Sequence, residues 1–240
     1  MKIKKIIFDL DNTLIDTERI KISLDGFVMG LYGISRDQAE EIYKSARNDR
    51  GHVVFNRETY REILQNELNR KEIEYHDGDV ERFFDKVNWK NFLLPGAIEI
   101  LEYCQNKNME IMLISLGNIN WQLEKIRNVG LDYYFNMKLG NLILTSQEGE
   151  GKINALKRVL GENNKNGEGV VIVNDKPDET YVILREFSSI VALLRRETKD
   201  ERYRPEIFTG MQDEFNGRIF VGDNLTYLTL ALDQLIQKLI

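Results

Sequence analysis

Two acidic residues end the first apolar stretch of the chain. Asp9 and Asp11 follow the run Ile6-Ile7-Phe8, and Thr13 stands two positions further on. Two carboxylates at the end of a buried strand repel each other and lose hydration, which raises a carboxyl pKa unless a cation or hydrogen-bond donors compensate. Mg²⁺ prefers oxygen ligands and keeps several of its waters, so it is the expected compensator. The pattern therefore predicts a Mg²⁺ site at the end of this strand.

Three later segments also place polar residues next to apolar stretches. Residues Ile111 to Ser115 form an apolar strand pattern that ends in a hydroxyl, and Lys152 begins a helix pattern with one apolar face. Val170 to Asp175 is another apolar strand pattern that ends in an acid, and a second acid, Asp178 or Glu179, follows three or four positions later. Ligands of open α/β sheets bind beyond the carboxyl ends of the strands, where these side chains are expected to meet.

In this order, the four segments resemble the signature motifs of the haloacid-dehalogenase-like (HAD) phosphohydrolases, and the first is similar to their DxDxT motif. The resemblance implies that Asp9 is the nucleophile, which forms an aspartyl phosphate, and that Asp11 is the general acid and base. Catalytic roles in this scheme fall on Asp9, Asp11, Ser115 and Lys152. Asn12 and Asn174 replace glycines that are more common in the family, which leaves the subfamily open.

The resemblance also implies how metal and phosphate are bound. Mg²⁺ would be held by Asp9, by Asp11 through its backbone carbonyl, and by Asp175. The phosphoryl group would be bound by Leu10, Thr13, Ser115, Leu116 and Lys152. Glu179 has the spacing of an outer-shell acid beside Lys152, and Asp178 is the other candidate for that position.

Each of these assignments has a simpler alternative. Taken alone, Ser115 is an ordinary strand-terminal serine and Lys152 a solvated lysine at a helix start, so both depend on the order of the segments. A second strand pattern, which ends at Gly222-Asp223, could also supply the acid of the last motif. Tyr227 stands where its second acid would be expected, and this strand comes one too late, so Asp175 is preferred.

Composition and charge limit the classes of partner and the compartment that are expected. The chain has 240 residues, of which 42% are hydrophobic and 30% charged, as is ordinary for a soluble globular protein. A net charge of -6 argues against nucleic acid as an electrostatic partner. No apolar run approaches the roughly 18 residues of a membrane span, and the first one is too short for a signal peptide. The single cysteine, Cys104, fits a reducing compartment. We expect a cytoplasmic protein that binds a small phosphorylated metabolite.

Strand and helix patterns alternate along most of the chain, which predicts an α/β fold with a three-layer, Rossmann-like parallel sheet core. The predicted strands are Ile3 to Phe8, Glu110 to Ser115, Phe135 to Leu139, Val170 to Val173, Ile190 to Leu194 and Arg218 to Val221. This core is assigned to residues 1–16 and 93–240.

Residues 17–92 show only helical periodicity, which predicts an inserted all-helical cap. Ser35 and Gln38 have the spacing of a capping box at the start of one of its helices. An all-helical insert directly after the first motif resembles the cap of the phosphoglycolate-phosphatase-like and phosphoglucomutase-like branch. Such a cap would exclude water and recognise the leaving group.

Substrate specificity is expected outside the shared motifs. Arg47, Arg50 and His52 lie in a polar stretch between two predicted helices of the insert, where they could contact a substrate. The polar segment from Arg195 to Gly217 carries mixed charges and is interpreted as a solvated surface excursion. Trp121 is expected to pack against the core.

These patterns together predict a Mg²⁺-dependent phosphomonoesterase acting on a small phosphorylated metabolite such as a sugar phosphate or nucleotide. A phosphomutase would use the same aspartyl phosphate, and a phosphate-binding regulatory protein without turnover is the alternative from another class. Dehalogenation is disfavoured because that branch of the family lacks a second Asp like Asp11.

Overall fold

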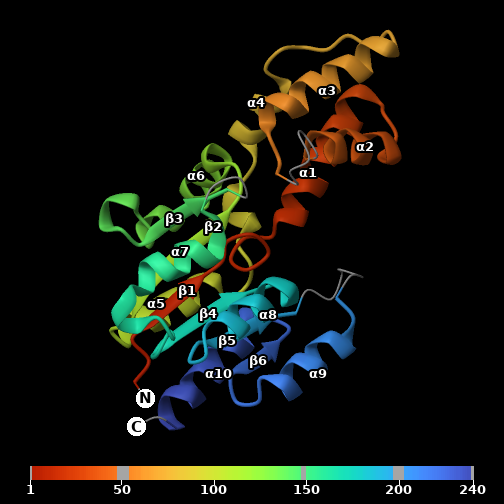
Figure 1. Cartoon of the computed structure of the whole chain (residues 1–240). Helices are drawn as coiled ribbons and strands as arrows, with labels where there is room; N and C mark the ends of the chain where they lie inside the picture. The colour runs from red at the N-terminus through yellow and green to blue at the C-terminus, as the bar shows by residue number, and fades with distance from the viewer. Residues whose placement is uncertain (1, 48–53, 147–149, 197–202, 239–240) are drawn as a thin grey trace.

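The computed structural model describes residues 2–47, 54–146, 150–196 and 203–238. Within these ranges, six parallel strands form one sheet in the order β3-β2-β1-β4-β5-β6 (Figure 1). The strands are β1 (Lys5–Phe8), β2 (Glu110–Leu116), β3 (Leu142–Thr145), β4 (Val170–Asn174), β5 (Val191–Arg195) and β6 (Ile219–Gly222). Since β1 lies between β2 and β4, the polar residues that follow these three strands come together at one edge of the sheet.

Helices cover both faces of this sheet, as the three-layer prediction requires. One face packs against α5 (Ala97–Asn106), α6 (Ile119–Asn128) and α10 (Leu225–Lys238). The other packs against α7 (Gly151–Leu160), α8 (Pro177–Glu186) and α9 (Pro205–Glu214). Along β1, Ile6 and Phe8 enter the first hydrophobic core and Ile7 the second, which is the alternation of a strand buried on both sides. The predicted α/β class is confirmed.

One predicted strand is wrong. Residues 135–139 were expected to form a strand, but they contain the 3₁₀ turn η4 (Met137–Leu139), and the edge strand β3 begins only at Leu142. The side chain of Asn136 accepts a hydrogen bond from a backbone N–H of that turn, at 2.8 Å. Gly140 follows with a φ of 72°, which suits glycine. These local bonds fold the apolar residues into a turn before they can join the sheet.

The other 3₁₀ turns of the described residues are short connections. They are η2 (Trp89–Phe92), η3 (Leu131–Tyr133) and η5 (Glu162–Asn164). No helix in the described ranges has both the length and the apolar character needed to cross a membrane.

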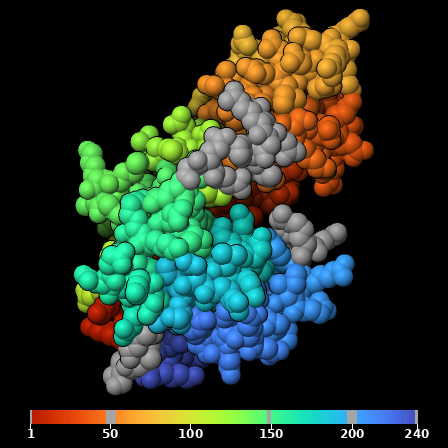
Figure 2. Space-filling model, in the orientation of Figure 1, coloured from red at the N-terminus to blue at the C-terminus, as the bar shows by residue number. Residues whose placement is uncertain are grey.

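Between β1 and η2, the described residues form an insert of four helices. They are α1 (Thr17–Tyr32), α2 (Arg36–Arg47), α3 (Arg57–Arg70) and α4 (Asp79–Lys86). Figure 1 shows them apart from the sheet, and in Figure 2 the same helices project from the α/β core as a separate lobe. The capping box is present at the start of α2: the Ser35 N–H donates to Gln38 Oε1 at 3.0 Å, and the Gln38 N–H donates to Ser35 Oγ at 3.3 Å.

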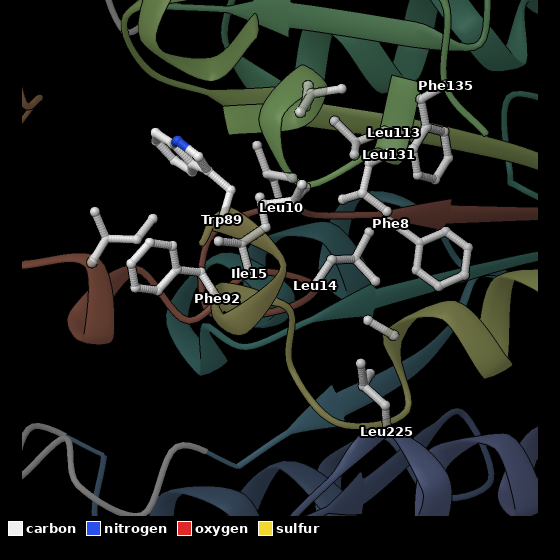
Figure 3. Close-up of a cluster of buried hydrophobic side chains, with 14 of the residues drawn as sticks. Phe8, Leu10, Leu14, Ile15, Trp89, Phe92, Leu113, Leu131, Phe135 and Leu225 are labelled. Atoms are coloured by element: carbon white, nitrogen blue, oxygen red, sulfur yellow. The ribbon is translucent and has the colours of Figure 1, made fainter. Parts of the chain in front are cut away.

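The two connections between the insert and the core lie side by side. The Asp16 N–H donates to the carbonyl of Phe92 at 2.8 Å, and the Leu94 N–H donates to the carbonyl of Leu14 at 2.9 Å. Beneath them, apolar side chains of the first turn after β1 pack against the aromatic residues of η2 (Figure 3). This packing anchors the turn that carries the first motif.

Candidate active site

Asp9 is the first residue after β1 and is held by donors on two sides. Its backbone N–H donates to the carbonyl of Val173 on β4 at 2.9 Å, so the end of the strand is fixed. Lys152 Nζ lies 2.5 Å from Asp9 Oδ1, and the Thr13 hydroxyl donates to Asp9 Oδ2 at 3.2 Å. Although the side chain is buried, both oxygens therefore have polar partners.

Lys152 links two acids from different parts of the chain. It lies in the first turn of α7, where the Gly151 N–H donates to Thr145 Oγ1 at 3.0 Å. Its ammonium group contacts Glu179 Oε1 at 2.6 Å in addition to Asp9. Burial acts to lower the pKa of Lys152, but the two carboxylates outweigh it and raise that pKa above its usual value. Lys152 is therefore a charged group inside the site.

Asp175 follows β4 and lies beside Asp9. The Thr13 hydroxyl is 3.5 Å from Asp175 Oδ1, so it stands between the two carboxylates. Burial and the neighbouring Asp9 raise the pKa of Asp175 to about 8. Burial is also the main cause that raises the pKa of Asp9. Two buried carboxylates with raised pKa values match the oxygen donors that Mg²⁺ prefers. The chemistry of these donors therefore fits the expected ion.

The Asp11 carboxylate is bound by α6 and not by Thr13 or Lys152. It contacts Lys125 Nζ and accepts a hydrogen bond from Gln122 Nε2 at 2.8 Å, and both residues belong to α6. Burial acts to raise the pKa of Asp11, but these partners lower it below its usual value. In the described parts of the chain, no three acid, histidine or cysteine side chains are grouped to hold a metal. Of the three predicted metal-site acids, Asp9 and Asp175 share the Thr13 hydroxyl, whereas the Asp11 carboxylate is occupied by α6. Asp11 therefore has its backbone carbonyl left for a metal.

The two acids after β4 have different surroundings. Glu179 Oε1 accepts from Lys152 and also from Asn174 Nδ2, at 2.9 Å. Burial acts to raise the pKa of Glu179, but Lys152 outweighs it and the pKa is lowered. Asp178 is exposed and accepts a hydrogen bond from the Tyr203 hydroxyl at 3.2 Å. The structure therefore places Glu179, and not Asp178, against Lys152.

Ser115 supplies a buried hydroxyl without a partner. The residue is 1% exposed at the end of β2, and its Oγ has no hydrogen-bond partner among the described residues. A buried polar atom normally has a partner, so this hydroxyl suits a group that arrives with a ligand. The Leu10 side chain is fully buried, and the Leu116 carbonyl accepts from Gln122 Nε2 at 3.1 Å. Leu10 and Leu116 could therefore contact a phosphoryl group only through their backbones.

Three polar residues at the site, Gln122, Lys125 and Arg195, do not follow from the sequence patterns. Gln122 and Lys125 were not singled out, although their spacing of three places both on one face of a helix. Arg195, assigned to a solvated excursion, is instead the buried last residue of β5, and its Nε donates to the carbonyl of Asn12 at 2.7 Å. Asn12 has a φ of 54°, so Arg195 supports the strained turn of the first motif. The rest of that excursion contains α9.

The positions of the expected specificity residues, and of the acid that competes with Asp175, are as follows. Arg47 ends α2, whereas Arg50 and His52 fall outside the described residues. Asp223, the competing acid, pairs with Arg196 at 2.6 Å at the edge strand β6.

Trp121 does not pack only against the core. Its ring centroid lies 5.1 Å from that of Phe55 and 5.3 Å from that of Phe84, both in the helical insert.

Known structures share this fold at low sequence identity. A HAD-type hydrolase from Bacillus subtilis, YfnB, solved with bound magnesium, is 13% identical with a TM-score of 0.61, over 97% of this chain and 100% of that one. A protein assigned as a β-phosphoglucomutase, from Thermotoga maritima, is 18% identical with a TM-score of 0.59, over 96% and 98%. An L-2-haloacid dehalogenase from Xanthobacter autotrophicus, with chloropropionic acid covalently bound, is 14% identical with a TM-score of 0.56, over 96% and 98%.

These structures span different reactions, so the fold alone does not choose between them. No curated protein matches the chain by sequence. A sequence model of the haloacid dehalogenase-like hydrolases matches residues 6–180, a range that runs from β1 through the helical insert to Glu179 and Thr180 on α8. The chain belongs to the haloacid dehalogenase-like hydrolase family.

Proposed function

We propose that this hydrolase is a Mg²⁺-dependent phosphomonoesterase acting on a small phosphorylated metabolite such as a sugar phosphate or nucleotide. The observation that carries the proposal is the placement of Lys152 against Asp9, with a second carboxylate, Asp175, on the other side of Thr13. A carboxylate nucleophile beside a fixed ammonium group and a cation site is what transfer of a phosphoryl dianion requires.

The first half of the reaction transfers the phosphoryl group to the enzyme. A carboxylate oxygen of Asp9 attacks phosphorus, and the bond from phosphorus to the leaving oxygen breaks with its electron pair on that oxygen. Asp11, in its protonated form, supplies the proton that the leaving oxygen needs and becomes a carboxylate. Lys152 and the free hydroxyl of Ser115 bind the phosphoryl oxygens, whose negative charge they offset.

The second half releases phosphate. Water attacks phosphorus and passes a proton to Asp11, and the bond from phosphorus to Asp9 breaks. The contact between Asp11 and Lys125 favours the ionised carboxylate, which is the form that accepts this proton. Both residues then return to their starting states.

The proposed ion would be held by Asp9, Asp175 and the backbone carbonyl of Asp11. When bound, Mg²⁺ supplies positive charge that stabilises the transferring phosphoryl group. The Thr13 hydroxyl donates to Asp9 and lies 3.5 Å from Asp175 Oδ1, so it stands between the two carboxylates that would hold the ion.

Phosphate release under defined conditions tests the proposal. The purified protein is incubated with Mg²⁺ and a panel of phosphorylated metabolites plus p-nitrophenyl phosphate, and an Asp9→Asn preparation controls for contaminating phosphatases. We expect Mg²⁺-dependent release of inorganic phosphate from at least one sugar phosphate or nucleotide. Isomerised sugar phosphate without net release would identify a mutase, and halide release from 2-chloropropionate a dehalogenase. Binding without any turnover would identify a regulatory protein.

A further inference from the structure

Helix α6 carries two buried polar side chains that end on the same acid. Gln122 and Lys125 are each 2% exposed, and both contact the Asp11 carboxylate. Glutamine and lysine are rarely so deeply buried, because each must lose its hydration. An apolar residue would fill the same space without that penalty, so packing alone does not account for this pair.

The end of β2 provides both an acceptor and space for the Gln122 side chain. Its Nε2 donates both to Asp11 and to the carbonyl of Leu116, directly after Ser115. A Cβ at Gly117 would lie 2.6 Å from this nitrogen, so only glycine leaves room for the amide. Gln122 therefore ties Asp11 to the end of β2.

Lys125 is enclosed by aromatic and acidic groups. Its Nζ contacts Asp11 and lies 5.7 Å from the centroid of the Trp121 ring. That ring packs against Phe55 and Phe84 of the helical insert. The charge of Lys125 therefore has Asp11 as its ion-pair partner at the boundary between core and insert.

Asp9, the other acid of the first motif, is held by a different helix. Asp9 is bound by Lys152 from α7, on the other face of the sheet, whereas Asp11 is bound from α6, which also pairs with the insert through Glu124 and Arg57 at 2.7 Å. The two catalytic carboxylates are thus held by helices on opposite faces. In an in-line displacement the attacking water and the leaving group lie opposite the Asp9 oxygen. The acid available to exchange a proton with them is Asp11, which α6 holds.

We propose that Gln122 and Lys125 are positioning residues that hold the Asp11 carboxylate where it accepts the proton of the attacking water. The proposal rests on the phosphomonoesterase function. It predicts that loss of either contact slows hydrolysis of the aspartyl phosphate more than its formation. With p-nitrophenyl phosphate this difference is large, because p-nitrophenolate leaves readily without a proton.

Rapid-mixing kinetics with p-nitrophenyl phosphate and Mg²⁺ test this. For Lys125→Met and for Gln122→Leu we expect kcat to fall at least tenfold while kcat/KM changes less than threefold. A burst of p-nitrophenol close to one equivalent per enzyme is expected before the steady state, with phosphate retained on the acid-quenched protein. Asp11→Asn should give the same pattern, and adding Lys125→Met to it should reduce kcat less than twofold further.

Arg127→Met is the matched control, since Arg127 is an exposed residue of the same helix and should leave both constants unchanged. A merely structural role for Lys125 and Gln122 would reduce the amount of active enzyme, so kcat and kcat/KM would fall by the same factor without a burst. That result in both variants would overturn the positioning role. A wild-type protein that releases no phosphate from any monoester would instead overturn the proposed function, and this proposal with it.

Discussion

Asn174 donates a hydrogen bond from its side-chain amide to Glu179 at 2.9 Å, and through Glu179 it supports Lys152. The same amide donates to Thr180 Oγ1 at 3.1 Å, and Asn174 Oδ1 accepts from the Asp175 N–H at 3.0 Å. One buried side chain thus fixes the acid beside the lysine and the backbone of the second acid of the site.

We predict that Asn174→Ala destabilises the protein and weakens catalysis. Buried hydrogen-bond partners left unsatisfied cost about 1–3 kcal/mol each, so the free energy of unfolding should fall by at least that amount. Urea unfolding measures it. Activity should fall as well, because Glu179 no longer has a fixed position. A variant with unchanged stability and activity would show that the bonds of Asn174 are dispensable.

Asp9→Asn should leave the fold intact and reduce kcat to below about 1% of wild type, since loss of a nucleophile commonly costs ~10³-fold or more. The amide cannot attack phosphorus, and it also removes a charge from the proposed metal site. Asp178→Asn, an exposed acid near the site, is the control and should retain full activity. Activity of Asp9→Asn above a few per cent, with circular dichroism like wild type, would refute its role as the nucleophile.

Mg²⁺ should raise the melting temperature, and more at pH 8 than at pH 6. The pKa of Asp175 is about 8 in the folded protein and 3.8 ordinarily, so the metal-free folded state retains a proton that the unfolded chain releases. Its stability therefore falls as pH rises from 3.8 to about 8. Binding of Mg²⁺ displaces this proton and is favoured over the same range, which adds to native-state stability.

Thermal melts with and without millimolar Mg²⁺ at the two pH values measure the effect. Asp175→Asn should respond less to the ion and lose the pH dependence of that response. If Mg²⁺ left the melting temperature of the wild type unchanged at both pH values, and the protein kept full activity in a chelator, the metal site would be excluded.

The helical insert should set substrate choice, because in the proposed reaction Asp9, Ser115, Lys152 and Asp175 would contact only what all phosphomonoesters share. We predict that Arg47→Ala, Arg50→Ala or His52→Ala changes the relative kcat/KM among natural substrates more than it changes hydrolysis of p-nitrophenyl phosphate. Activity profiles over the same metabolite panel compare the variants. If every variant scaled all substrates equally, recognition would have to come from other residues.

Sequence was sufficient where a local pattern determines the structure. The strand before Asp9, the capping box of Ser35 and Gln38, and the acid after β4 all follow from neighbouring residues. The sequence was insufficient where two residues in contact are far apart in the chain. Lys125 lies 114 positions from Asp11 and Arg195 lies 183 from Asn12, so neither contact can be predicted from residues nearby in the sequence.

The paired connections of the insert, Asp16 with Phe92 and Leu14 with Leu94, bring the chain back to almost the place where it left. A short turn could close that gap, since joining ends that already touch costs little entropy. The backbone path of the α/β core is therefore compatible with inserts of different length at this point. The insert is one continuous segment and can therefore be exchanged as a unit. A lineage with this core could acquire new substrates by such a replacement while its catalytic chemistry stayed the same.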